Sequence, residues 1–162
     1  MAVVLARVDN RLVHGQVLEA WVPALGVDTI LVVDPELGED RLQKMVLEGL
    51  SRRGLHVKIV TPLEAVALLA GVLRETRVMV LFRGLRQACV ARDAGVPFEA
   101  LNLGNLHPCQ ESSSLTVSVY LTAEDEQLLR ELAECGVSLE ARAVPADRGP
   151  DVSRWLAERV PC

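Results

Sequence analysis

Apolar runs alternate with amphipathic stretches along almost the whole chain of 162 residues. This alternation is typical of βαβ units, in which helices join the strands of a parallel sheet. Several runs are nearly continuous in Val, Ile and Leu, as expected for strands that helices cover on both faces. The pattern predicts an α/β domain with strands at Val3–Val8, Thr29–Val33, His56–Val60, Val78–Phe82, Ala100–Leu103, Thr116–Leu121 and Ser138–Val144.

Segments with helical periodicity lie between these strands, at about 15–25, 39–50, 62–74, 85–95 and 123–135, with a last one near 151–160. Two helix starts are signalled strongly, because Thr61–Glu64 and Thr122–Asp125 each place a threonine cap three residues before an acid. Gly95 and Gly136 mark helix ends. Nothing in the composition divides the chain, so residues 1–162 are expected to form one domain.

An open parallel sheet binds its ligand outside the carboxyl ends of its strands. The loops to consider are therefore 9–14, 34–38, 61, 83–84 and 104–114. The last of these is the one long polar stretch without periodicity, and loops of that length are often functional.

Composition narrows the classes of function. Although 50% of the residues are hydrophobic, no apolar run approaches the ~18 residues of a membrane span, and Arg7 and Asp9 interrupt any signal-peptide core. Membrane insertion and secretion are not expected. A net charge of −5 disfavours a nucleic-acid partner. The four cysteines form no CxxC pair, so we expect reduced thiols in the cytoplasm, no metal and no cofactor.

Common nucleotide and nucleophile motifs are missing from the loops. Neither GxGxxG after the first strand nor GxxxxGK[ST] occurs, and there is no GxSxG elbow. The third strand ends at Thr61-Pro62 rather than at the acceptor aspartate of a receiver domain. What remains is the first loop, residues 9–16, which is the densest polar group at any strand end.

His14 is predicted at or just before the N-terminus of the first helix, where Gly15 and Gln16 offer free backbone N–H groups. A neutral imidazole nitrogen can attack phosphorus, and the resulting charge approaching −2 suits a helix N-terminus. The alternative is a capping or solvated histidine. The residues alone leave both interpretations open.

Two charged neighbours carry similar alternatives. Arg11 could hold two phosphoryl oxygens with its guanidinium, or it could be a surface arginine paired with Asp9. Asp9 could form an Asx-turn, or it could orient Arg11 or the imidazole.

The segment Arg7–Val17, followed by Trp21, closely resembles the active-site segment of the IIB component of the phosphoenolpyruvate-dependent sugar phosphotransferase system, mannose/fructose/sorbose family. The resemblance covers roughly residues 2–147, and the tail 148–162, with Trp155 on a short amphipathic helix, lies outside it. Further matching segments follow in order at Val32–Asp34, Leu81–Arg83, Gly95–Pro97, Leu101–Gly104, Gly136–Val137 and Val144–Pro145.

The resemblance implies a free-standing IIB domain with an open, doubly wound, mostly parallel sheet of about seven strands and helices on both faces. The first strand would lie in the middle of the sheet. If the first and fourth strands are neighbours, Arg83 would open beside His14, where it could contact the phosphoryl group or an acidic partner; the alternative is a surface arginine. The tail 148–162 would pack on the domain or on a second subunit.

The resemblance also implies the chemistry. His14 would accept a phosphoryl group on Nδ1 from a IIA histidine and pass it to a sugar entering through the membrane components IIC and IID. Arg11 would stabilise the phosphoryl group, with Asp9, Gly15 and Gln16 in support. The chain would be cytoplasmic, associated peripherally with the permease, and could form a homo-oligomer.

Two other functions use the same loop. A regulatory phospho-relay protein would carry phosphate on His14 without serving a transporter, and a phosphate-binding module would transfer nothing. Asn10 departs from the family pattern, which commonly has a second aspartate there. His107, in the long loop, could support the site or have no part in it, and the sequence assigns no role to His56 or to the cysteines.

Overall fold

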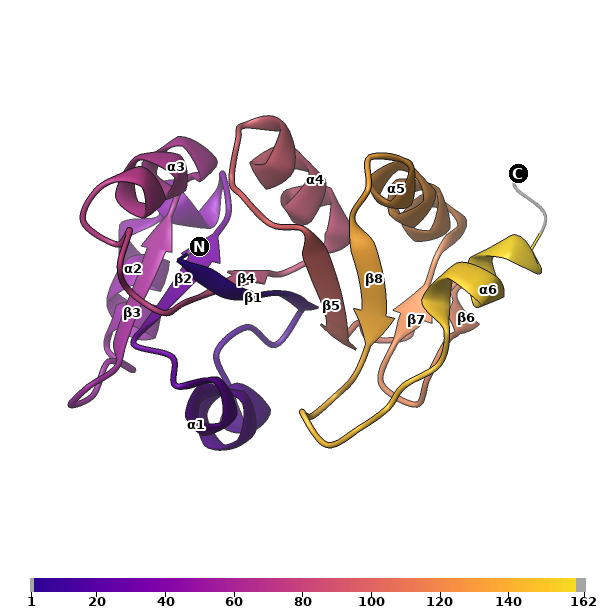
Figure 1. The fold of residues 1–162 in the computed structure, drawn as a ribbon, viewed down its shortest axis with the longest axis horizontal. Helices are drawn as coiled ribbons and strands as arrows, with labels where there is room; N and C mark the ends of the chain where they lie inside the picture. The colour runs from indigo at the N-terminus through magenta and orange to yellow at the C-terminus, as the bar shows by residue number, and fades with distance from the viewer. Residues whose placement is uncertain (1, 160–162) are drawn as a thin grey trace.

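A parallel sheet of six strands forms the centre of the computed structural model, which describes residues 2–159 (Figure 1). The strand order is β3-β2-β4-β1-β5-β8, and every neighbouring pair is parallel. The first strand therefore lies inside the sheet beside the fourth, as predicted. The strands are β1 (Val3–Asp9), β2 (Thr29–Val33), β3 (His56–Val60), β4 (Val78–Phe82), β5 (Ala100–Asn105) and β8 (Ser138–Ala141).

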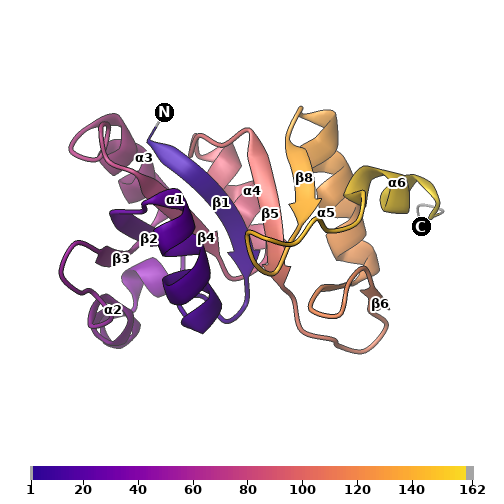
Figure 2. The same ribbon diagram turned by 60° about the horizontal axis from the view of Figure 1, so that its bottom comes forward.

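Helices cover both faces of this sheet, which confirms the doubly wound α/β class. On one face lie α3 (Pro62–Ala70), α4 (Leu85–Asp93) and α5 (Ala123–Glu134), while η1 (Val17–Trp21) and α1 (Val22–Leu25) cover the other (Figure 2). Both predicted capping boxes form, at the starts of α3 and α5. The remaining helices are η2 (Leu37–Glu39), α2 (Arg41–Glu48) and α6 (Val152–Ala157).

The segment predicted as a strand at Thr116–Leu121 meets the sheet only through an isolated parallel bridge between Val119 and Leu106, just after β5, so the sheet has six strands rather than about seven. Thr116 Oγ1 accepts hydrogen bonds from the backbone N–H groups of Ser118 and Val119, which folds the chain into a turn. After the bridge residue Val119, β7 (Tyr120–Leu121) pairs antiparallel with β6 (Ser113–Ser114).

The tail packs on the domain itself. Val152 and Leu156 of α6 are buried in the same core cluster as Leu129 and Leu132 of α5. The helix was predicted near 151–160 and ends at Ala157; residue 160 lies outside the described residues. Within residues 2–159 no helix is long and apolar enough to cross a membrane.

The alternation of β1 sends two polar side chains into the core. Ala6 and Val8 face the core beneath α3, α4 and α5. Successive side chains of a strand point to opposite faces, so Arg7 and Asp9 point to the side of η1 and α1. Both are fully buried, with 0% of their surface exposed. Arg7 thus fills a volume that an apolar side chain would normally occupy, and no Cβ at Gly104 of β5 could fit beside its guanidinium.

We predict that Gly104→Ala lowers the free energy of unfolding by about 3 kcal/mol, because the added methyl group displaces the buried Arg7 from its partners. Urea denaturation followed by circular dichroism measures the change. Gly15→Ala is the matched control, since a Cβ there meets nothing within 4 Å, and its effect should stay within about 1 kcal/mol. Equal effects of the two substitutions would contradict the close packing of Arg7 on Gly104.

Candidate functional site

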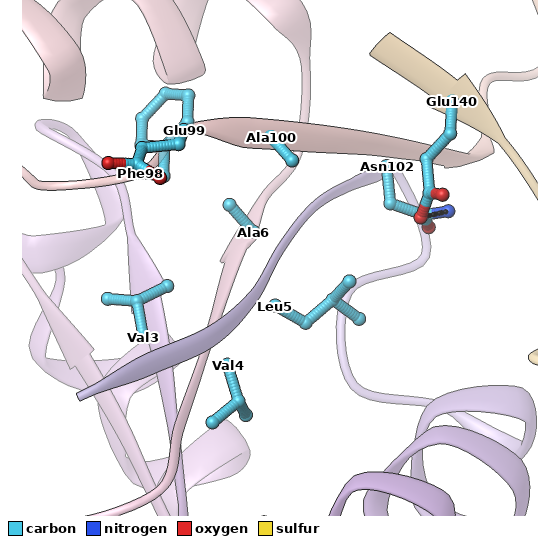
Figure 3. A pocket seen from close by; sticks show the side chains of 9 residues that line it. All are labelled: Val3, Val4, Leu5, Ala6, Phe98, Glu99, Ala100, Asn102 and Glu140. Carbon is cyan, nitrogen blue, oxygen red and sulfur yellow. Dashed lines mark hydrogen bonds between the residues drawn. The ribbon is translucent and has the colours of Figure 1, made fainter. Parts of the chain in front are cut away.

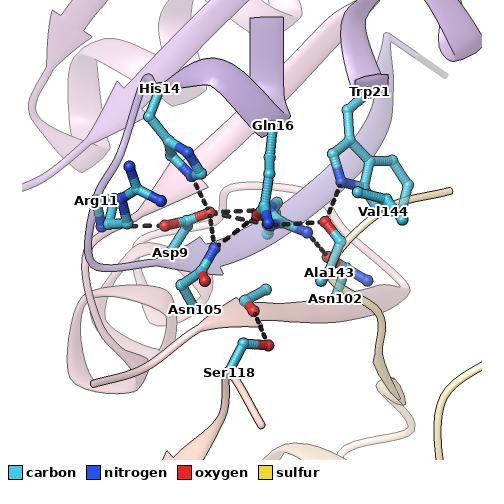
Figure 4. A network of polar contacts seen from close by, with 12 residues as sticks. Asp9, Arg11, His14, Gln16, Trp21, Asn102, Asn105, Ser118, Ala143 and Val144 are labelled. Atoms are coloured by element: carbon cyan, nitrogen blue, oxygen red, sulfur yellow. Dashed lines mark hydrogen bonds and ion pairs between the residues drawn. The ribbon is translucent and has the colours of Figure 1, made fainter. Parts of the chain in front are cut away.

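The Asp9 carboxylate, at the carboxyl end of β1, is the hub of a buried polar network (Figure 4). Its Oδ2 lies 2.7 Å from His14 Nε2 and accepts hydrogen bonds from Arg7 Nη2 at 3.0 Å, Arg7 Nε at 3.2 Å and Asn105 Nδ2 at 3.0 Å. Its Oδ1 accepts from the backbone N–H of Arg11 at 3.0 Å, the Asx-turn anticipated from sequence. One carboxylate therefore fixes both the loop and the imidazole.

Arg7 is held from three further directions. Its Nη1 donates to Asn102 Oδ1 at 2.7 Å and to the backbone carbonyl of Arg142 at 2.9 Å, and its Nη2 donates to the carbonyl of Ala143 at 3.2 Å. The guanidinium also lies over the Trp21 ring, 5.3 Å from its centroid. These contacts come from β5, from the segment after β8 and from η1, so Arg7 ties the site to three elements distant in sequence.

The charges of the network define the tautomer of His14. Burial lowers the pKa of the Arg7 guanidinium, while the charge and hydrogen bonds of Asp9 act in the opposite direction; an arginine nevertheless stays protonated in a protein. Paired with this cation, the Asp9 carboxylate is ionised and can only accept hydrogen bonds. His14 Nε2 must therefore carry the proton, which leaves the lone pair on Nδ1. Nδ1 is buried and has no hydrogen-bond partner among residues 2–159.

The helix that follows His14 begins at Gly15, as predicted, and continues to Leu25 through the π-helical turn of η1. The carbonyl of His14 accepts the hydrogen bond of Leu18 N–H, so His14 stands at the helix N-terminus. Space beside Gly15 is open. The early N–H groups of a helix N-terminus are suited to an anion.

Gln16 is drawn inward rather than outward. Its Oε1 accepts from Asn105 Nδ2 at 3.0 Å, which links the first turn of the helix to β5. The π-turn places Trp21 over Arg7, and the indole Nε1 donates to the carbonyl of Ala143 at 2.9 Å. A π-turn inserted in a helix is frequent at functional sites, and here it positions a side chain of the network.

Arg11 is exposed, and within residues 2–159 its guanidinium makes no hydrogen bond or ion pair. Its contact with Asp9 runs through the backbone and not through the predicted surface ion pair. The next residue, Leu12, has a φ of 55° in the left-handed region, which is costly for a branched side chain. The loop before His14 thus carries two features: the exposed guanidinium of Arg11 and, at the next residue, the strained backbone of Leu12.

Arg83 does not reach His14, although β4 and β1 are neighbours as the prediction required. Its Nε lies 2.7 Å from Asp34 Oδ2, and its Nη2 lies 2.8 Å from Glu36 Oε2. Both acids follow β2, on the other side of β4. The two carboxylates bind the guanidinium on that side, so Arg83 has the ion pairs of a surface arginine, the other interpretation drawn from sequence, rather than a contact with His14.

The other histidines and the cysteines lie outside the network. His56 is exposed on the edge strand β3, and the side chain of His107 is exposed while its backbone N–H lies against the Asn10 amide. Burial raises the pKa of the Cys89 thiol to about 11, which keeps it protonated at neutral pH. Cys162 lies outside the described residues. No group of metal-binding side chains occurs in the described part of the chain.

A cavity of about 250 Å³ lies at the opposite end of β1 (Figure 3). Val3, Leu5 and Ala100 line it together with the carboxylates of Glu99 and Glu140. None of the loops at the carboxyl ends of the strands contributes a side chain to it. Asn102, which accepts from Arg7 Nη1, also lines the cavity, so the cavity meets the polar network at that one side chain.

Sequence reasoning missed most of the network that holds His14. Asn102 and Asn105 were not singled out, and Arg7 was noted only as part of the matching segment. The sequence did contain a signal for Arg7, because it is a charged residue in the middle of a strand whose other residues are mostly apolar. Asn102 and Asn105 are recognised as partners only from the parallel register, which sets Arg7 beside Asn102 and Asp9 beside Asn105. That register depends on the pairing of β1 with β5, which the sequence does not show.

Comparisons with known proteins identify the family and the fold. The family model of the PTS system sorbose subfamily IIB component matches residues 3–160, which extends the similarity through the tail. The chain is 33% identical over 159 residues to the sorbose-specific EIIB component of Lacticaseibacillus casei, covering 98% of this chain and 97% of the relative. It is 29% identical to the fructose-specific EIIB component of Bacillus subtilis over 161 residues, 96% of each chain.

Among solved structures, the IIBSor domain of the sorbose permease from Klebsiella pneumoniae superimposes with a TM-score of 0.88 at 28% identity, covering 100% of both chains. Family match, relatives and fold agree over essentially the whole length. The chain belongs to the sorbose subfamily of IIB components of the sugar phosphotransferase system.

Proposed function

We propose that this IIB component carries a phosphoryl group on Nδ1 of His14, receiving it from a IIA phosphohistidine and delivering it to a sugar that enters through IIC and IID. Family membership supports the class of reaction. The observation that carries the assignment of the atom is the 2.7 Å contact between His14 Nε2 and Asp9, which leaves the lone pair on Nδ1.

The reaction consists of two transfers of one phosphoryl group. In the first, the N–P bond on IIA breaks as the lone pair of His14 Nδ1 forms a new N–P bond. In the second, a sugar hydroxyl attacks phosphorus, the N–P bond on His14 breaks, and the hydroxyl proton leaves to solvent. Throughout, Nε2–H can keep its hydrogen bond to Asp9, so the ring need not lose a proton to accept or release the group.

Three groups of this chain would receive the phosphoryl charge. The helix beginning at Gly15 has free N–H groups in its first turn, next to His14 in the chain, and these can donate to a phosphoryl group on the ring. The free guanidinium of Arg11, three residues before His14, can close on the same group from the loop. Arg7 remains buried beneath Asp9 and neutralises it.

Nδ1 is shielded in this conformation, and only 8% of the His14 side chain is exposed. Transfer therefore requires the ring or the loop to move as a partner docks. The left-handed Leu12 marks the strained point of the loop, and a change there would uncover Nδ1 without disturbing β1.

The expected partners follow from the family: a IIA protein as donor and the membrane components IIC and IID as acceptor complex. We place the protein in the cytoplasm, at the surface of the permease. Which sugar is transferred does not follow from the site, since the relatives at 33% and 29% identity are specific for different sugars.

Incubation with phosphoenolpyruvate, enzyme I, HPr and a cognate IIA should place one acid-labile phosphoryl group on the chain, and His14→Ala should abolish it. Intact-mass spectrometry at neutral and acid pH measures the labelling. His56→Ala is the matched control and should label normally, because that side chain is exposed on the edge strand β3. Stoichiometric labelling of the His14→Ala protein would refute the proposal.

For Asp9→Asn we predict transfer from IIA slowed about 100-fold, because an amide nitrogen cannot accept the proton of Nε2 and the tautomer is no longer fixed. The unfolding free energy should also fall by about 3 kcal/mol, since the buried Arg7 loses its counter-charge. Nitrogen NMR of labelled histidine separates the two effects: wild type should show the Nε2–H tautomer and the variant a mixture. Asp93→Asn, at an exposed position, controls for loss of charge.

Arg11→Ala should slow transfer about 10-fold or more with no loss of stability, because its guanidinium is free in the unphosphorylated protein and acts only on the phosphoryl group. Arg11→Lys should be intermediate, since it retains the charge but not the fork. Quenched-flow labelling in both directions measures the rates, with Arg74→Ala, 77% exposed, as control. Unchanged rates in both directions would remove Arg11 from the site.

A further inference from the structure

Helix α2 presents its apolar face to solvent. Leu42, Met45, Val46 and Leu50 follow the i, i+3, i+4, i+8 spacing of one helical stripe, and they are 68%, 74%, 61% and 40% exposed. None of the residues Arg41–Glu48 is fully buried. A contiguous exposed stripe of this kind differs from single exposed apolar residues, which are common on surfaces, and marks a surface that another molecule covers.

The polar side of α2 faces the protein and explains this orientation. Lys44 and Glu48 are half-buried, and Glu48 Oε1 accepts a hydrogen bond from the backbone N–H of Ile59 in the edge strand β3 at 3.3 Å. Leu47 is the one apolar side chain of the helix that packs against the core. Because the helix docks through its polar side, the stripe Leu42–Leu50 is directed outward.

Charges at the two ends of the stripe have opposite signs. Glu39 and Asp40 precede the helix and are exposed, and the exposed Arg41 begins it, so this end keeps one net negative charge, while Arg52 and Arg53 follow the helix and are exposed as well. The exposed Arg52 makes a surface contact with Glu19 at 3.5 Å. The stripe therefore has an acidic end and a basic end, with apolar side chains between them.

We propose that this stripe binds the same stripe of a second copy of the chain, with the two α2 helices antiparallel across a two-fold axis. In that arrangement the acidic end of each stripe meets the basic end of the other, and the apolar side chains meet in the middle. A two-fold interface needs a surface that complements itself, and opposite charges at the ends of one helix satisfy this requirement. An apolar centre with a charged rim is also the usual composition of an interface.

The size of the surface determines the strength of the association. One short helix and its flanking turns bury less than the ~1,200 Å² of a stable complex, so the dimer is weak and depends on protein concentration. No residue of α2 takes part in the Asp9 network, so both His14 loops stay open to other partners. The inference does not depend on the proposed phosphoryl transfer.

Sedimentation velocity of the whole chain from about 10 to 500 μM should show a monomer–dimer equilibrium, and Met45→Glu should weaken the dimer at least tenfold. Val72→Glu is the matched control, since Val72 is 81% exposed beyond the end of α3 and should leave the equilibrium unchanged. Thermal unfolding should be alike for the three proteins, because both positions are exposed. A monomer throughout this range, or an equal effect of the two substitutions, would overturn the proposal.

A charge exchange tests the antiparallel arrangement. Glu39→Arg and Arg53→Glu should each weaken the dimer, because each sets like charges against each other at both ends of the interface. The double variant restores opposite charges and should recover most of the wild-type dissociation constant. If the two effects simply add, the helices do not pair in this way. Phosphorylation of His14 is measured separately, so its failure would leave this result untouched.

Discussion

The buried ion pair of Arg7 and Asp9 is the constraint on which the site depends. Two charges with 0% exposure are costly to remove from water, and the pair is tolerated only because its hydrogen-bonding groups are satisfied. The partners come from η1, β5 and the segment after β8, so these elements must meet at the end of β1. The same requirement fixes Gly104, since only a residue without a side chain leaves room for the guanidinium.

A pair of this kind contributes little net stability, and apolar residues of similar volume could replace it without loss. Its value lies in what it does to His14. An isolated carboxylate in the core would take up a proton and become a poor acceptor for Nε2–H. With Arg7 beside it, Asp9 stays ionised, holds the imidazole through one nitrogen and leaves the other free for chemistry.

Much of the fold was readable from sequence, because strands buried on both faces and capped helices leave local signals. The sheet, both capping boxes and the loop around His14 follow from such signals. The sequence leaves alternatives open, or misleads, where long-range contacts decide. Arg83 turned to two carboxylates behind β4, and the predicted strand 116–121 folded into a turn around a threonine hydroxyl. The exposure of the apolar stripe of α2 could not be predicted for a related reason. Periodicity shows that a helix has an apolar face, but not whether that face packs on the core or faces solvent.

A phosphoryl carrier must release its group as readily as it accepts it, and the arrangement of charges fits this need. A permanent cation against Nδ1 would hold the phosphoryl group too tightly, whereas a bare carboxylate nearby would repel it. Here the fixed cation, Arg7, is paired with Asp9, and Asp9 contacts the ring at Nε2. Arg7 neutralises the charge of the Asp9 carboxylate, so that charge neither attracts nor repels a group on Nδ1. In the proposed function the cation available to the phosphoryl group is Arg11, which lies on a loop with a strained turn at Leu12 and can move away from the group as the partner takes it.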